Sequence, residues 1–143
     1  MEQQGGAESF GVGKMIADYL ENGLLDNIVD MFKHDENLYE YAGDLLTDER
    51  MRVRIGAIAL FEALGKEAPD KVKRALPSVL SLLENQNPVV RGDAAYLLGI
   101  IGNRDIIPFL EKITNDEDAN VRLIARETIE DIRGALDPMN ALQ

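Results

Sequence analysis

TDERMRVRIGAIALFEALG at residues 47–65, ENQNPVVRGDAAYLLGIIG at 84–102 and NDEDANVRLIARETIEDIR at 115–133 are three copies of one pattern. In each copy a valine–arginine pair is followed, three residues after the arginine, by an alanine. After the alanine at offset 4 from the valine, apolar residues continue at offsets 7, 8 and 11 in the first two copies and at offsets 8 and 11 in the third. This spacing is the 3.6-residue period of one buried helical stripe, so each copy predicts an amphipathic helix.

A second helix is expected before each of the two later copies. Pro77 and Pro108 both lie fourteen residues before the next arginine of the pattern, and they open the apolar runs LPSVLSLL and IPFLEKI. The arginines are spaced by 37 and then 31 residues, and the six extra residues fall between Gly65 and Pro77. This insertion is rich in basic residues, which are Lys66, Lys71, Lys73 and Arg74. Asn87 and Asp118 are the expected N-caps of the helices that follow them.

The repeat fades upstream, where helices are predicted at 14–21, 24–33 and 36–46. No stretch alternates with a period of two, so no sheet is required. We expect about six or seven helices in one domain, residues 14–134. Residues 1–13, which contain four glycines, predict a flexible segment, and residues 135–143 a C-terminal tail.

These helical pairs, the proline that opens the second helix and the valine–arginine interval resemble HEAT-like repeats. The resemblance implies an all-α fold, an α-solenoid that forms a right-handed superhelix of about three to four antiparallel helix pairs. In that family an acid or amide six residues before the arginine forms a ladder with it that bridges adjacent repeats. The ladder residues in this sequence are Asp48 with Arg54, Asn85 with Arg91, and Asp116 with Arg122.

The faces of the aligned helices predict which of them lie inside the stack. Residues 94–101, AAYLLGII, are apolar all round, and residues 55–64, IGAIALFEAL, almost so, which predicts that both helices are sandwiched between neighbours. The last copy has polar residues where its siblings are apolar, and it is therefore the expected C-terminal cap. Those residues are Arg126, Glu127, Glu130 and Asp131.

Composition and charge narrow the class of protein. The chain has 143 residues, of which 45% are hydrophobic and 29% charged, and it contains no cysteine. It has neither an apolar run long enough for a membrane span nor a secretory leader, so a cytoplasmic protein without disulfides is expected. Residues 1–49 hold 12 acids against Lys14 and Lys33. The negative charge of this stretch disfavours nucleic acid as a ligand. The acidic stretch forms either a solubilising surface or a docking site for a basic protein partner.

Two short motifs suggest ligand chemistry but lack the residues it needs. His34 is the only histidine, and its acidic neighbours Asp35 and Glu36 do not converge on a metal as an i, i+4 pair would. GVGK at 11–14 has Glu8 in place of the first glycine of a phosphate loop and Met15 in place of its serine or threonine. We therefore expect no metal, cofactor or catalytic residue.

Two classes of function are compatible with the resemblance. HEAT-like di-iron hydroxylases use repeated His–Glu pairs, and HEAT-fold DNA-repair enzymes use a basic face, and this sequence has neither. Of the two compatible classes, the first is a non-catalytic scaffold or regulatory subunit that binds a protein partner. The alternative is a subunit of a lyase-type enzyme, similar to the bilin lyases.

A solenoid of this kind is expected to recognise its partner by shape, through its concave surface. The second helices, around residues 70–84 and 104–114, are expected to line that surface. Tyr39, Tyr41 and Tyr96 are further candidates, because tyrosine is favoured in binding hot spots, although helical spacing favours core packing for Tyr41 and Tyr96. The candidate contacts are Ser78, Ser81, Glu111, Lys112 and Tyr39.

Overall fold

The computed structural model describes the backbone of residues 2–136 and the side chains of residues 11–135. The described chain consists of eight α-helices and five short 3₁₀ helices, with no strand among them. The predicted all-α repeat fold is confirmed. The chain divides into two compact units, residues 1–74 and residues 75–143, and each is described by itself.

Unit 1 holds the less regular part of the sequence and the first copy of the repeat. Its core centres on Phe32, whose ring meets those of Tyr39 and Phe61 edge to face, with centroids 5.1 Å and 6.2 Å apart. Aliphatic residues such as Ile16, Leu46 and Leu60 complete this fully buried core. The elements are α1 (Glu2–Glu21), α2 (Leu25–His34), η1 (Glu36–Tyr41), α3 (Ala42–Leu46), α4 (Met51–Glu67) and η2 (Val72–Ala75).

Helix α1 begins at Glu2 rather than at Lys14, where the sequence predicted the first helix to start. Glycines weakened that prediction because each costs a helix interior up to about 1 kcal/mol relative to alanine. Gly13 has a packing role, since a Cβ atom there would lie 3.1 Å from Cδ1 of Tyr41. At the other end, α8 continues to Leu136, and the predicted tail beyond it lies outside the described residues.

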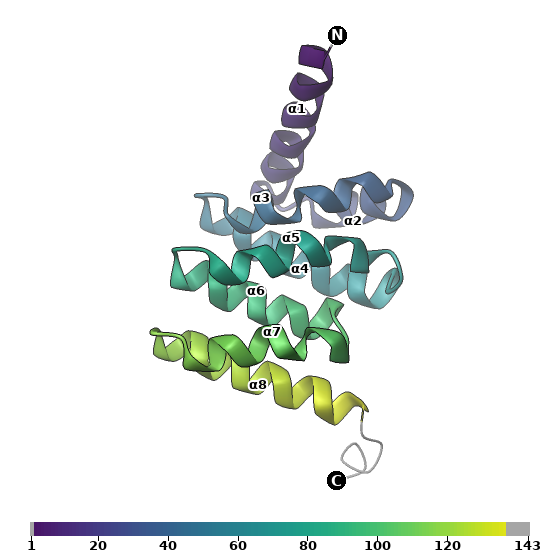
Figure 1. Ribbon diagram of the computed structural model, residues 1–143. Helices are drawn as coiled ribbons and strands as arrows, with labels where there is room; N and C mark the ends of the chain where they lie inside the picture. Colours follow the sequence, from purple (N-terminus) through teal and green to yellow (C-terminus); the bar gives the residue numbers. More distant parts are fainter. Residues whose placement is uncertain (1, 137–143) are drawn as a thin grey trace. The chain divides into compact units, whose positions relative to one another are not determined.

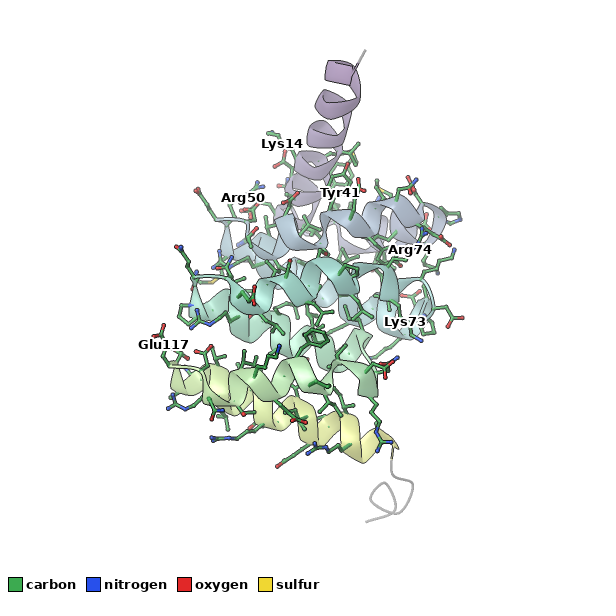
Figure 2. All side chains as sticks on the ribbon, viewed as in Figure 1. Lys14, Tyr41, Arg50, Lys73, Arg74 and Glu117 are labelled. Carbon is green, nitrogen blue, oxygen red and sulfur yellow. The ribbon has the colours of Figure 1, made fainter. Side chains whose placement is uncertain are left out.

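The basic insertion packs back onto unit 1. Nζ of Lys71 donates to the carbonyl oxygen of Lys33 at 2.8 Å, in the last turn of α2, where cations satisfy unpaired helix carbonyls. Nζ of Lys33 in turn lies 3.2 Å from Glu67. Arg74, at the end of the insertion, pairs with Glu36 at 2.9 Å (Figure 2). The six extra residues therefore tie α4 to the C-terminal end of α2.

Unit 2 holds the two later copies of the repeat, with the second helices α5 and α7 on one side and the first helices α6 and α8 on the other (Figure 1). Pro77 and Pro108 each lie in the first turn of their helix, where a missing N–H costs little. The elements are α5 (Leu76–Ser81), η3 (Leu82–Glu84), α6 (Pro88–Ile101), η4 (Arg104–Ile106), α7 (Ile107–Lys112), η5 (Ile113–Asn115) and α8 (Ala119–Leu136).

Helices α6 and α8 approach closely because α6 has glycines two turns apart on the face it turns to α8. A Cβ on Gly92 would lie 3.1 Å from Cδ1 of Ile124, and one on Gly99 would lie 2.8 Å from Cγ2 of Thr128. Thr128 is buried at a position that is apolar in the other copies. The opposite, polar side of α8 is exposed, as expected, at Arg126, Glu127, Glu130 and Asp131.

Candidate functional site

The loop before each repeated helix has the same hydrogen-bonded form. The side chain six residues before the arginine accepts the backbone N–H two residues further on, and the arginine Nη1 donates to two loop carbonyls, at distances of 2.7 to 3.2 Å. This geometry explains why the sequence pairs an acid or amide with an arginine at that interval. The arginine and loop pairs are Arg54 with Asp48, Arg91 with Asn85, and Arg122 with Asp116.

Between the two repeats of unit 2, the side chains of the loops also bridge one repeat to the next. Arg91 donates through Nε and Nη2 to both carboxylate oxygens of Asp116, each at 2.9 Å, and both side chains are about nine-tenths buried. The Arg91 hydrogen bonds hold the pKa of Asp116 below its ordinary value, although burial opposes them. Arg122, in contrast, contacts the Asp116 loop through main-chain carbonyls.

In unit 1 a different arginine makes the side-chain bridge. Arg50 binds Asp48 of its own loop at 3.1 Å and reaches Asp18 of α1 at 2.8 Å. Lys14, one turn earlier on α1, pairs with the same Asp18 at 3.2 Å, and Figure 2 shows both basic residues at this end of α1. Hydrogen bonds from Arg50 hold the pKa of Asp18 and of Asp48 below the ordinary range. The network anchors α1 to the loop before α4.

These three carboxylates predict a loss of stability in acid. Asp18, Asp48 and Asp116 have pKa values below 3.8 when folded, so near pH 3 the unfolded chain binds more protons than the folded chain. Their contribution is complete above about pH 5 and is lost as pH falls through the folded pKa values. Urea midpoints measured between about pH 7 and pH 2.5 should fall steeply at the acid end.

The matched control for this acid effect is Asp116→Asn, which cannot ionise. Its urea midpoint should be lower than that of the wild type at neutral pH, and it should change less on acidification because one of the three titrations is gone. If the urea midpoints of the two proteins fell by the same amount on acidification, Asp116 would not contribute to the acid effect.

The candidate contacts on the second helices lie in unit 2. The hydroxyl of Ser78 donates to the Ala75 carbonyl at 3.1 Å, and that of Ser81 donates to the Ser78 carbonyl at 2.7 Å. Glu111 is exposed and pairs with Arg133 of α8 at 3.4 Å. Each serine hydrogen is thus already used within its own helix, so an approaching ligand meets these hydroxyls mainly as acceptors.

Sequence reasoning missed Phe109, which is 44% exposed on the same side of α7 as Lys112. Nζ of Lys112 lies 5.9 Å from the centroid of the Phe109 ring, a cation–π distance. Glu111 and Lys112 are the only candidate contacts chosen from the apolar run IPFLEKI. The helical spacing of the run does indicate that Phe109 is exposed, because it lies outside the stripe formed by Ile106, Ile107 and Leu110, which are all buried.

Two of the tyrosine assignments from the sequence are wrong. Tyr39 is 1% exposed and packs on Phe32, so it is a core residue and not a surface contact. The tighter winding of η1 turns its ring inward, and burial, followed by the charge of Glu36, raises the pKa of its hydroxyl. Tyr96 was expected in the core, but nearly half of its surface is exposed on α6.

The acidic residues of the N-terminal third lie on the surface of unit 1. The exposed carboxylates there include Asp26, Asp30, Glu36, Glu40, Asp44 and Glu49.

His34 is exposed as well, and its Nδ1 lies 2.8 Å from the Asp30 carbonyl oxygen. Among the described residues, no group of three or more potential ligands is placed to hold a metal ion. Nor is any described helix long and apolar enough to cross a membrane.

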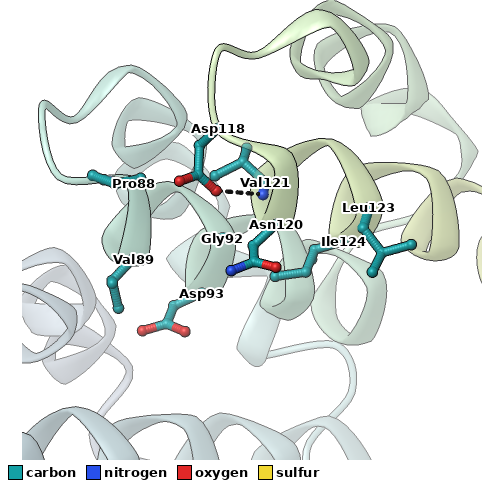
Figure 3. A pocket seen from close by; sticks show the side chains of 9 residues that line it. All are labelled: Pro88, Val89, Gly92, Asp93, Asp118, Asn120, Val121, Leu123 and Ile124. Carbon is teal, nitrogen blue, oxygen red and sulfur yellow. Dashed lines mark hydrogen bonds between the residues drawn. The ribbon is translucent and has the colours of Figure 1, made fainter.

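The first helices carry exposed apolar residues of their own. A hollow of about 270 Å³ lies in unit 2 between the beginnings of α6 and α8 (Figure 3). Val89 and Leu123 stand on its rim, and Asp118 within it accepts the N–H of Val121 at 3.0 Å, which caps α8. The residues that line it are Pro88, Val89, Gly92, Asp93, Asp118, Asn120, Val121, Leu123 and Ile124.

Comparison with known proteins supports the repeat pattern. A family model described as HEAT repeats matches residues 39–130, which is more than half of the chain. No curated protein matches the sequence.

Proposed function

Because the chain belongs to the HEAT-repeat family, we propose that it is a non-catalytic scaffold or regulatory subunit that binds a protein partner. HEAT repeats generally mediate protein–protein interactions. The proposed contact surfaces are the second-helix face of unit 2, formed by α5 and α7, and the acidic surface of unit 1.

The exposed ring of Phe109 carries this proposal. A phenylalanine with 44% of its surface in water loses the benefit of burial, and a partner that covers it recovers that free energy. Lys112 beside the ring supplies a polar group at the margin of an apolar contact. An apolar centre with a polar rim is the usual anatomy of a protein interface.

The acidic surface favours a basic partner. Residues 1–49 hold 12 acids and two bases, so this part of unit 1 attracts positively charged proteins before contact. Such attraction speeds association and weakens as salt rises, because the screening length falls from about 10 Å at 0.1 M to about 3 Å at 1 M.

Affinity capture with surface variants tests the proposal. We expect the wild-type chain to retain a protein from the lysate of its source organism. A Phe109→Ser variant should lose that protein if the second-helix face binds it, and a Glu40→Lys, Asp44→Lys double variant should lose it if the acidic surface does. In the second case the captured protein should be basic and should elute as salt is raised.

The control is Glu127→Gln, an exposed change on the outer side of α8, which should leave capture intact. Circular dichroism should show the same helicity for all of these proteins, because every changed side chain is exposed or partly exposed. A wild-type chain that retains no protein, or retention that is unchanged in both variants, would contradict the proposal.

A further inference from the structure

A second hollow lies in unit 1, at the point where α1 ends, α2 begins and the first turns of α4 pass beside them. Its volume is about 410 Å³. The residues that line it are Leu20, Glu21, Asn22, Gly23, Leu25, Arg52, Ile55 and Gly56.

Two glycines shape the chain around this hollow. Gly23 has a φ angle of +78°, a left-handed conformation that glycine adopts without strain, and it reverses the chain between α1 and α2. Gly56 lets α4 approach α1 closely, since a Cβ atom there would lie 3.1 Å from Cβ of Leu20.

An exposed aliphatic side chain lines the hollow. Ile55 is 60% exposed. Two further apolar residues near it in the sequence are exposed although they do not line the hollow: Met51, one turn earlier on α4, and Leu24, which follows Gly23. Burial of exposed apolar surface against a partner is favourable, at roughly 25 cal/mol per Å².

Within this apolar setting lies a carboxylate oxygen that lacks a donor. Oε2 of Glu21 is buried, and no hydrogen-bond donor reaches it from the described residues. A carboxylate is an acceptor only, and a buried polar atom without a partner costs free energy. A cationic N–H group brought by a ligand would supply the missing hydrogen bond and the opposite charge.

We propose that this hollow binds a segment of a basic protein partner in which a lysine or arginine lies within one helical turn of a large aliphatic or aromatic residue. The basic group donates to Glu21, and the apolar residue covers Ile55. Arg52 also lines the hollow, so the segment carries one basic residue there and not a cluster. The inference rests on the proposed binding function and gives the acidic unit a defined contact point.

Selection from a phage-displayed library of random 16-residue peptides tests this site, with the full chain as bait and an excess of soluble Ile55→Asp variant as competitor. Peptides that survive the competition depend on Ile55, and we expect them to contain Lys or Arg within four residues of Leu, Ile, Met or Phe. Synthetic copies should bind the wild type at least about tenfold more tightly than the Ile55→Asp or Glu21→Gln variants.

Leu123→Asp is the matched control. Leu123 lies two residues after the pattern valine of α8, as Ile55 does in α4, and it is 52% exposed, so this variant should bind the peptides as the wild type does. The site is wrong if no Ile55-dependent peptide emerges, if such peptides lack the basic residue, or if Glu21→Gln binds them unchanged. A parallel selection without the competitor that yields only peptides dependent on Phe109 would overturn this site and leave the proposed function standing.

Discussion

Replacing Leu97 with alanine is expected to lower the free energy of unfolding by about 2 to 5 kcal/mol. Leu97 lies in the middle of α6 and has no exposed surface, and its neighbours Ala94, Leu98 and Ile101 are buried as well. Truncation removes the transfer free energy of three carbons and leaves a cavity that a packed helix interior closes only in part. Urea unfolding followed by far-UV circular dichroism measures the change.

The control for this substitution is Leu123→Ala, the same chemical change on α8 at a side chain that is 52% exposed. It is expected to cost less than about 0.5 kcal/mol, because an exposed leucine has little burial to lose. A Leu97→Ala variant as stable as the Leu123→Ala variant would show that α6 is not packed as described.

Replacing Arg91 with methionine is expected to cost about 3 kcal/mol. The methionine keeps much of the side-chain volume, but it removes the paired hydrogen bonds to Asp116 and those to the carbonyls of Asn85 and Gln86. Asp116, with about one tenth of its side chain exposed, then remains charged without its partner. Leaving a buried charge unpaired accounts for most of the expected loss.

Arg74→Met is the matched control for Arg91→Met. Arg74 also forms an arginine–carboxylate pair, with Glu36 at 2.9 Å, but about half of each side chain is exposed. Exposed pairs contribute at most about 1 kcal/mol, so this variant should unfold near the wild-type midpoint. A second substitution, Asp116→Leu, in the Arg91→Met variant should recover part of the lost free energy of unfolding, because it removes the unpaired charge. No recovery would contradict the charge argument.

Most helices could be predicted from the sequence because their signals are local. The stripe from Val90 to Ile101 and the prolines at 77 and 108 mark individual turns of helix, and the elements appear within a few residues of the predicted positions. The start of α1 was missed because local propensity counts glycines as helix breakers. In the structure, Gly13 packs against Tyr41, a residue 28 positions away that a local pattern does not include.

The candidate surfaces were harder to predict than the helices. Tyr39 was a candidate surface contact but is buried in η1, a 3₁₀ helix whose winding differs from that of an α-helix. Phe109 was not singled out from the sequence, although it is exposed. The hollow beside Glu21 was not predicted either. It requires Gly23, Leu20 and Gly56 to meet, and these residues belong to segments separated by about thirty positions.

The sequence by itself determined the repeat, the all-α class and the form of the loops, since the acid or amide and the arginine six residues later interact within one loop. Only the tertiary structure decided how the loops are joined. Arg91 reaches Asp116 across 25 residues, whereas in unit 1 Arg50, and not Arg54, bridges Asp48 to Asp18. The physical reason is that a salt bridge between segments depends on which helix packs beside the loop, and that is a property of the packed chain.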